Sequence, residues 1–416
     1  MSRRAAALFF ILTAAGASCA ADDFFDRVEE SLSWHTAEGA VRARVSGAID
    51  VEVFRIPQPA PALLYSEDGT LATSRLSAFV DVQAGSSIYA FAQLRVDRGF
   101  DPGDEKAALR LDEYALRWTP SREGRFSLQA GKFATLVGNW VARHASWDNP
   151  FVTAPLPYEN LTGIWDAAPA ASVETLLAWA HVRPLAPAGV AAADKELRLP
   201  IVWGPSYTHG AAVSGRIGEF TYAAEIKNAA ISSRPTTWDS ARFKAGHASW
   251  SARLGYQPNQ MWNFGLSVAE GSYLAPSAAG LLAPRLGVQD SRQRVVAQDL
   301  GFAWHHWQVW AEAFTARFEI PRVGEADTFA YYVEARYKFT PQLFGAVRWN
   351  EQVFDRLPDR AGSRERWGVN LRRLDLAPTY RLSPHAQLKL QYSLEFHALG
   401  PSRFVQWAGA QVTVRF

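Results

Sequence analysis

Apolar and polar residues alternate along most of the chain, in segments of about ten residues each. In residues 41–53, for example, the odd positions are mainly apolar, whereas the even positions are mainly charged or small. The same period of two returns in residues 76–83, 88–97, 329–339 and 388–396. Because successive side chains of a β-strand point to opposite faces, this pattern predicts strands that have one apolar and one polar face.

Two all-β architectures fit such strands. A soluble β-sandwich would bury the apolar face in a core, whereas an outer-membrane β-barrel turns that face to lipid and its polar face to a lumen. A strand of ten or eleven residues rises about 3.3 Å per residue and, tilted by roughly 45°, spans about 25 Å, the apolar band of such a barrel. The number and length of the segments favour a transmembrane antiparallel β-barrel, and a periplasmic soluble β-sandwich is the alternative.

The connections between the segments give a second criterion, because outer-membrane barrels alternate short periplasmic turns with longer outward loops. Short turns are expected at residues 85–86, 121–124, 167–171, 218–219, 258–260, 305–306, 340–342 and 383–384. Longer links fall at residues 57–72, 99–105, 135–160, 184–205, 230–246, 271–292, 319–327, 355–364 and around 401–402. Eight turns and nine loops predict 18 strands. This count requires Leu161–Asp166 to be a strand, and 16 strands is the alternative.

Residues 135–160 interrupt the alternation. The segment contains three prolines, two tryptophans and several charged residues, without a helical stripe of apolar positions. A structureless segment of this length inside a compact domain is usually functional or disordered, and this one is too aromatic for disorder. We therefore expect a constriction loop that folds into the mouth of the barrel.

The first 39 residues precede the strand pattern. Residues 1–21 have the parts of a secretory signal peptide: a basic start, an apolar run over residues 5–15, and small residues before a cleavage site. Residues 22–39 form an N-terminal periplasmic or plug segment, in which residues 24–34 have the apolar spacing of a short helix; a frayed leader is the alternative. The barrel itself is expected over residues 40–416.

Composition narrows the function further. The net charge of +2 falls close to zero once the two arginines of the signal peptide are removed, so nucleic acid is not an implied partner. The 24 Phe, 13 Tyr and 16 Trp suit strands and the interfaces between a membrane and water. His144, Ser146 and Asp148 are too close in sequence for a catalytic triad, and the nine histidines have no metal-ligand spacing. We expect neither an enzyme nor a cofactor.

Several motifs in order resemble a known family. They are GKFATLVGNW at 131–140, YTHGAAVSGRIGEFTYAAEIKN at 207–228, SARLGYQP at 251–258, YYVEARYKFTPQLFGAVRWN at 331–350, and a closing strand FVQWAGAQVTVRF that ends on an aromatic carboxylate. The chain resembles Gram-negative porins and is most like the phosphate-selective (O and P type) superfamily. The resemblance implies a diffusion channel in the outer membrane of a Gram-negative bacterium, either a monomer or a homotrimer, whose third outward loop folds inward as a constriction.

The constriction loop supplies the first group of candidate residues. They are Lys132, Trp140, Arg143, His144, Trp147, Asp148, Tyr158 and Glu159. The aromatic members could form a slide for flat solutes or pack the loop against the wall, and the charged members could set selectivity. Phosphate-selective channels line their path with several lysines, whereas the charges here are mixed, so phosphate selectivity does not carry over.

The polar strand faces supply the second group, in which arginine predominates. The pore-lining candidates are Arg42, Arg44, Arg75, Arg95, Arg117, Arg125, Arg216, Arg336, Arg348 and Arg381. A guanidinium group stays charged and binds carboxylate or phosphate groups, so these residues favour a slight anion preference. The alternative is that they pair with neighbouring acids and hold the barrel wall.

The expected function is therefore a passive diffusion channel for small hydrophilic solutes, with outer-membrane lipid around it. A non-conducting outer-membrane barrel, which serves adhesion or scaffolding through its outward loops, is the competing interpretation.

Overall fold

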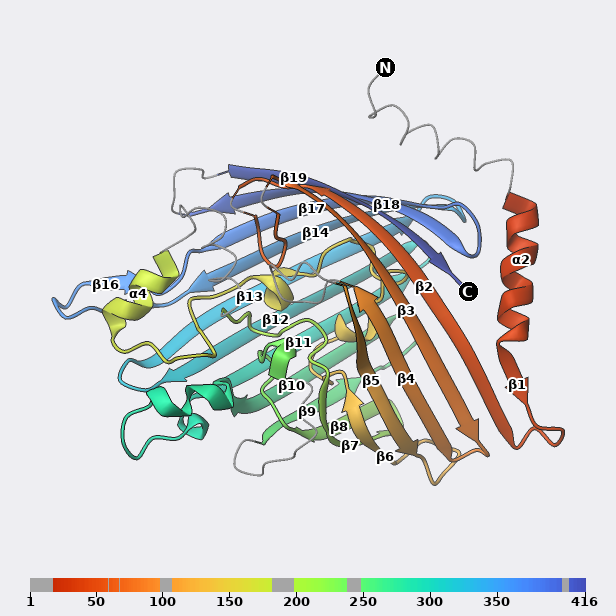
Figure 1. The fold of residues 1–416 in the computed structure, drawn as a ribbon, viewed down its shortest axis with the longest axis horizontal. Helices are drawn as coiled ribbons and strands as arrows, with labels where there is room; N and C mark the ends of the chain where they lie inside the picture. Colours follow the sequence, from red (N-terminus) through yellow and green to blue (C-terminus); the bar gives the residue numbers. More distant parts are fainter. Residues whose placement is uncertain are drawn as a thin grey trace, which may run out of the picture.

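The computed structural model describes residues 18–58, 60–66, 68–97, 107–181, 198–237, 248–398 and 404–416. Its large antiparallel sheet has 17 strands, of which β1 (Ser33–His35) lies outside the ring and the other 16 form a barrel (Figure 1). The barrel closes where its last strand, β19 (Phe404–Arg415), pairs with its first, β2 (Val41–Arg55). The expected all-β barrel is confirmed with 16 strands, and the count of 18 is wrong.

The other barrel strands pair in chain order. They are β3 (Thr70–Ala84), β4 (Ile88–Asp97), β5 (Ala108–Trp118), β6 (Ser127–Phe133), β7 (Thr208–Ile217), β8 (Phe220–Lys227), β9 (Ser249–Tyr256), β10 (Trp262–Ser272), β11 (Arg292–Trp304), β12 (Trp307–Ile320), β13 (Gly324–Lys338), β14 (Leu343–Phe354), β17 (Leu371–Arg381) and β18 (Ala386–His397). A separate hairpin of β15 (Arg356–Pro358) and β16 (Arg364–Arg366) lies between β14 and β17.

The two ends of the barrel differ in their connections. At one end, here called the turn end, the links are residues 85–87, 119–126, 218–219, 257–261, 305–306, 339–342 and 382–385. At the other, here called the loop end, they are residues 56–69, 98–107, 134–207, 228–248, 273–291, 321–323, 355–370 and 398–403. Seven of the expected turns are present, and the expected turn at residues 167–171 is not.

The miscount of strands has a local cause. The backbone amide of Thr162 donates to the carbonyl of Leu199, and that of Leu199 donates to Ile164, so Leu161–Asp166 pairs within its own connection and not with the barrel. The chain then forms α4 (Val173–His181), a helix whose apolar positions follow the helical and not the strand period. The expected loops at 135–160 and 184–205 are therefore parts of one connection, residues 134–207.

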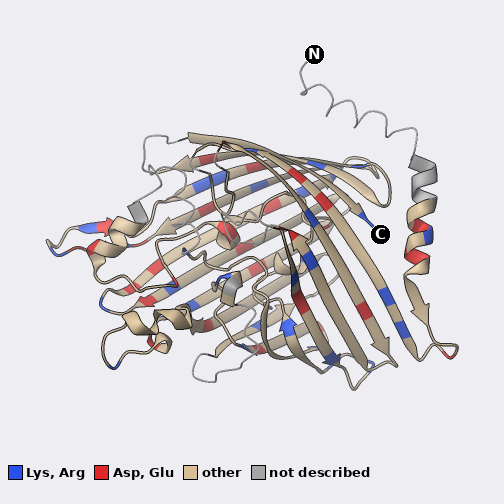
Figure 2. Cartoon of the chain, in the orientation of Figure 1, with Lys and Arg blue, Asp and Glu red and all other residues tan. Residues whose placement is uncertain are grey.

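The outward face of the barrel is apolar and its inward face is polar. Ile49 and Val51 of β2 are 44% and 50% exposed, whereas Asp50 and Glu52 between them are 1% and 8% exposed. Charged residues recur along many of the strands (Figure 2). A soluble β-sandwich would have the opposite arrangement, with its apolar side chains in the core, so the barrel interpretation holds and the sandwich does not.

Exposed aromatic side chains gather near both ends of the outward face. Near the turn end they are Trp118, Phe220, Tyr256, Trp304, Trp307, Phe339 and Tyr380. Near the loop end they are Trp250, Phe329, Phe396 and Phe404. Two such belts with an apolar band between them are typical of outer-membrane barrels, where the rings lie at headgroup level.

A helix, α2 (Ser18–Ser31), precedes β1 and lies beside the turn end (Figure 1). The ring of Phe25 stacks on that of His385 at 5.5 Å, and Asp26 Oδ1 lies 2.9 Å from His385 Nε2. Residues 1–17 of the expected signal peptide lie outside the described residues. Within the described part of the chain, the helices are too short or too polar to cross a membrane.

Because the apolar side chains face outward, the loss of stability caused by a new charge should depend strongly on the face of the strand that carries it. Replacing Ile49, near the middle of β2 and outward, by Arg should lower the free energy of unfolding in lipid vesicles by about 2–4 kcal/mol, because the charge enters hydrocarbon. Thr73→Arg on β3, whose side chain faces the lumen, should cost far less. Urea titration followed by tryptophan fluorescence compares the two, and equal losses would contradict the assignment of faces.

Candidate functional site

The connection between β6 and β7 enters the barrel instead of standing above it (Figure 1). It is the third connection at the loop end, counted from β2. Its first part, residues 134–166, contains the one-turn segments η2 (Val141–Arg143) and α3 (Leu156–Glu159) and is here called the inner loop. Polar side chains of the barrel wall bond to it along its length.

On β12 and β13 the wall holds the start of the inner loop. The carboxylate of Glu312 accepts hydrogen bonds from the backbone amides of Asn139 and Trp140, the latter at 3.0 Å, and from the hydroxyl of Tyr158 at 2.8 Å. Arg143 forms an ion pair of 2.6 Å with Glu334. These bonds satisfy loop amides that would otherwise be buried without partners.

Gly138 allows this close approach. Its φ of +78° lies in the left-handed region, which glycine adopts at low cost, and a Cβ there would collide with the Tyr158 hydroxyl and the Glu312 carboxylate. The glycine therefore belongs to the anchor between the inner loop and β12.

On β14, β17 and β18 the wall holds the middle and end of the inner loop. Arg348 donates to the carbonyl of Thr153 at 3.2 Å, and Lys389 donates to the carbonyl of Ser146 at 2.8 Å. Arg373 pairs with the carboxylate of Glu159. The guanidinium groups of Arg348 and Arg373 are fully covered as a result, so both contribute to the anchor and not to an open path.

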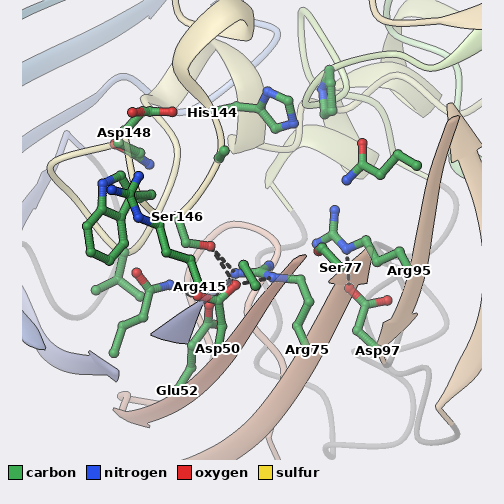
Figure 3. A pocket seen from close by; sticks show the side chains of 18 of the residues that line it. Asp50, Glu52, Arg75, Ser77, Arg95, Asp97, His144, Ser146, Asp148 and Arg415 are labelled. Atoms are coloured by element: carbon green, nitrogen blue, oxygen red, sulfur yellow. Dashed lines mark hydrogen bonds and ion pairs between the residues drawn. The ribbon is translucent and has the colours of Figure 1, made fainter. Parts of the chain in front are cut away.

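An open cavity of about 840 Å³ remains between the inner loop and the wall of β2, β3 and β4 (Figure 3). It is lined by every inward residue of β2 from Arg44, near the turn end, to Phe54, near the loop end. Ten residues of strand rise about 33 Å, so the cavity follows most of the barrel's height. A second cavity of about 940 Å³ lies between the inner loop and the wall from β7 to β12.

Ion pairs line the middle of the first cavity. Arg75 Nε lies 3.0 Å from Asp50 Oδ2, and its Nη2 lies 2.5 Å from Glu52 Oε1 and 3.2 Å from the hydroxyl of Ser146 on the inner loop (Figure 3). Ser146 in turn donates to Asp50 Oδ2 at 2.6 Å. The inner loop and the facing wall thus meet in one charged network.

A second set of ion pairs continues this network on β4 and β5. Arg95 Nε lies 2.6 Å from Asp97 Oδ2, and Arg110 bonds to Asp97 at 2.8 Å and to Asp112 at 3.0 Å. The arginines at this level therefore have carboxylate partners in the wall. This agrees with the alternative given above, in which the inward arginines pair with neighbouring acids.

Several arginines near the turn end, unlike those of the charged network, form no ion pair with a carboxylate among the described residues. Among the described residues, no carboxylate lies within 4.0 Å of the guanidinium groups of Arg336, Arg381 or Arg415. Arg415 stacks on the ring of Trp147 at 4.0 Å and Arg381 at 5.4 Å. On the inner loop, the exposed residue Asp148 directly follows Trp147, the residue on which Arg415 and Arg381 stack.

Seven of the eight expected constriction residues fall into three kinds. His144, Trp147 and Asp148 line the 840 Å³ cavity with exposed or half-buried side chains. Trp140 and Tyr158 are buried and pack together, with ring centroids 4.6 Å apart.

Arg143 and Glu159 are the anchoring members described above. Lys132 does not belong to the constriction. It shares the strand phase of Leu128, which is 42% exposed on the outward face, and its ammonium group donates to the carbonyl of Leu111 at 2.9 Å. Proximity in sequence to the loop was thus a poor guide, because a strand sends alternate residues to opposite faces.

The expected pore-lining arginines also lie in different places. Those that line the 840 Å³ cavity are Arg44, Arg75 and Arg95. Those near the turn end of the lumen or in its links are Arg42, Arg117, Arg125, Arg216, Arg336 and Arg381. Arg125 is a correction, because it sits in the exposed link between β5 and β6 and pairs with Glu123. The sequence analysis missed Arg415 and Glu312, although both occupy the inward phase of their strands.

His144 is held as a neutral ring by its surroundings. Its Nδ1 donates to the carbonyl of Val141 at 2.6 Å, and its Nε2 accepts from the hydroxyl of Tyr207 at 2.7 Å. Burial, together with repulsion from Arg95 and Arg75, lowers the pKa of His144 to about 4. The described residues contain no group of three His, Cys, Asp or Glu side chains that could hold a metal ion.

Comparison with known proteins places this architecture in a class. No family model and no curated protein matches the chain. Among solved structures, it is similar to the OmpF of Salmonella typhi in complex with daunomycin (TM-score 0.54, 9% identity, 92% of this chain and 100% of that chain). It is also similar to the anion-selective porin of Comamonas acidovorans (0.51, 11%, 90% and 99%) and the outer-membrane channel DcaP of Acinetobacter baumannii (0.53, 10%, 92% and 99%).

The fold is therefore that of the Gram-negative outer-membrane porins, with 16 strands and an inward loop. At such low identities the likeness concerns the fold alone. The finer resemblance to the phosphate-selective superfamily is not confirmed by these neighbours.

The contacts of Glu312 predict its effect on the inner loop. Glu312→Ala should leave two backbone amides and a hydroxyl without partners, at about 1–3 kcal/mol each, and so release the loop from β12. We expect a larger and noisier single-channel conductance. Glu351→Ala, which removes an ion pair with Arg372 on the outward face, is the matched control. Identical conductance in the two variants would contradict the anchoring role.

The environment of His144 predicts its titration. Because the folded pKa of about 4 lies below the ordinary value of 6.5, the neutral ring stabilises the fold fully above pH 6.5, and this contribution decreases as the pH falls through 4. NMR of ¹⁵N-histidine-labelled protein should show one ring with a midpoint near 4, absent from the His144→Gln variant. A midpoint near 6.5 for that ring would refute the assignment.

Proposed function

We propose that the protein is an outer-membrane porin, a passive diffusion channel for small hydrophilic solutes with a slight preference for anions. The observation that carries this proposal is the 840 Å³ cavity, which follows the inward face of β2 from Arg44 to Phe54 past the inner loop. A polar passage of this length inside a barrel suits the transit of hydrated solutes.

The outward face supports a position in the outer membrane. Its apolar band and two aromatic belts match a surface in contact with lipid, and the connections are long at only one end of the barrel. By analogy with porins, the loop end would face outward and the turn end the periplasm. We further propose that residues 1–21 direct export and that α2, whose Asp26 and Glu29 line the cavity, narrows its periplasmic mouth.

The charges without partners support the anion preference. Charges that form ion pairs within the wall largely cancel for a passing ion, so unpaired groups decide the sign of the potential. Near the turn end three arginines (Arg336, Arg381 and Arg415) have no carboxylate partner among the described residues, whereas Asp148 is the exposed acid beside them. The excess of one sign is small, which makes the preference slight.

Two features support a homotrimer. The strands β6, β8 and β9 have seven or eight residues, against fifteen in β2, β3 and β13. A strand of seven residues, tilted by about 40°, spans roughly 18 Å, less than the apolar band of about 25 Å. The half-buried polar side chains of Tyr114 and His209 point outward from this low wall, where a neighbouring protomer would shield them from lipid. One solved neighbour, the OmpT of Vibrio cholerae, is described as a trimer form.

Planar-bilayer recording tests the channel and its sign. Purified protein should insert with discrete current steps, and a potassium chloride gradient should give a reversal potential that indicates a small excess of chloride permeability. The double variant Arg381→Gln, Arg415→Gln should lower the permeability ratio of chloride to potassium by about twofold, because it removes unpaired positive charge. Arg125→Gln, in an exposed link outside the cavity, is the control.

Two outcomes would contradict the proposal. Protein that inserts without current steps would favour the competing interpretation, a barrel that serves adhesion or scaffolding. Current steps with a cation preference that the double variant leaves unchanged would refute the anion preference and leave the channel intact.

A further inference from the structure

The 840 Å³ cavity is not uniformly polar. At the loop end its lining is apolar: Phe54, Leu71, Leu64 and Val152 contribute half-buried or buried side chains, backed by the buried ring of Trp407. Phe54 and Leu71 are paired across β2 and β3, so their side chains form one continuous apolar surface on the wall. A solute that enters from the loop end meets this surface before it meets the charged network.

Charges of both signs begin one step deeper along the same strand. Glu52 and Asp50 are the next two inward residues after Phe54, two and four residues away, which corresponds to about 7 Å and 13 Å along the strand. Arg75 lies between these two carboxylates, with 23% of its side chain exposed to the cavity. The apolar surface and a bipolar charged surface thus lie within the length of one small molecule.

Charges of both signs line the cavity in two zones. Around Arg75 and Arg95 the cavity is also lined by Asp50, Glu52, Asp97 and Glu113. Near the turn end Arg44 and Arg415 line the cavity together with Asp26, Glu29 and Asp148. A solute that carries one charge of each sign can match both zones without a net electrostatic cost.

We infer that the cavity favours small amphipathic zwitterions, that is, solutes with a neighbouring ammonium and carboxylate and an apolar side group, such as amino acids with a branched aliphatic side chain. This inference rests on the proposed function and names the solute class of the same channel. The apolar group contacts Phe54, Leu64 and Leu71, while the ammonium faces Glu52 and the carboxylate faces Arg75. Burial of apolar area adds affinity, and the existing ion pairs keep binding weak enough for release.

Current block in planar bilayers tests the inference with matched solutes. Leucine carries both charges, 4-methylpentanoate lacks the ammonium, isoamylamine lacks the carboxylate, and serine lacks the apolar group. Leucine should reduce the single-channel current at a concentration at least fivefold lower than each of the other three. Equal or weaker block by leucine would overturn the inference.

Variants locate the contacts. Leu64→Ser should weaken block by leucine at least threefold and leave block by serine unchanged, whereas Leu281→Ser, on an exposed part of the link between β10 and β11, should alter neither. Glu52→Gln keeps the size of the side chain and should shift the preference from leucine towards 4-methylpentanoate. If neither cavity variant changes block, the site is not the one described.

The outcomes also separate this inference from the function on which it rests. A channel that conducts and does not discriminate among the four solutes refutes the zwitterion preference and leaves the porin proposal standing. Protein that forms no channel refutes both.

Discussion

The bonds between the barrel wall and the backbone of the inner loop determine the shape of the lumen. A loop inside a barrel must satisfy its amides and carbonyls, since buried unpaired backbone groups are costly. Here charged wall side chains do so, most directly Glu312 at the start of the loop and Arg348 and Lys389 further along. Without these partners, the backbone groups of the loop would be buried in the lumen without hydrogen bonds, and the loop would not be held there.

The polar face of the strands therefore has two different uses. On β14, β17 and β18 it is occupied by the inner loop, whereas on β2, β3 and β4 it stays open and lines the 840 Å³ cavity. This difference decides what an arginine does: Arg75 and Arg348 both point inward, yet the first meets the cavity and the second is covered by the loop.

The period of two was sufficient to predict the barrel, its inside-out orientation and most of its turns, because each depends on local alternation. The strand count failed at Leu161–Asp166, where a short extended segment found its partner at Leu199 within the same connection. Its sequence resembles a strand, and only the tertiary partner distinguishes the two cases. The apolar residues of α4, a few positions later, have a helical spacing. This spacing was the one sequence feature that indicated that the next barrel strand had not yet begun.

The site was predictable to a lesser degree. Phase along the strands placed Arg75 and Arg95 on the inward face, but whether an inward charge is paired, covered or open depends on residues far away in sequence. Lys132 shows the reverse error, since its nearness to the loop outweighed its strand phase. Arg415 has the inward phase of the last strand, yet its importance follows from Trp147, which the inner loop brings to it from a distant part of the chain.

The seam between β2 and β19 has a consequence for how this protein reaches its folded state. Thr413 and Gln411 donate hydrogen bonds across it to Asp50 and Glu52, residues separated from them by 363 and 359 positions. Contacts between such distant parts of a chain form late and slow the folding rate. Until the seam closes, both edge strands are open to aberrant pairing, and the charged network has only part of its wall. Closure of the ring therefore also completes the wall of the cavity, which Gln411 and Arg415 of β19 line.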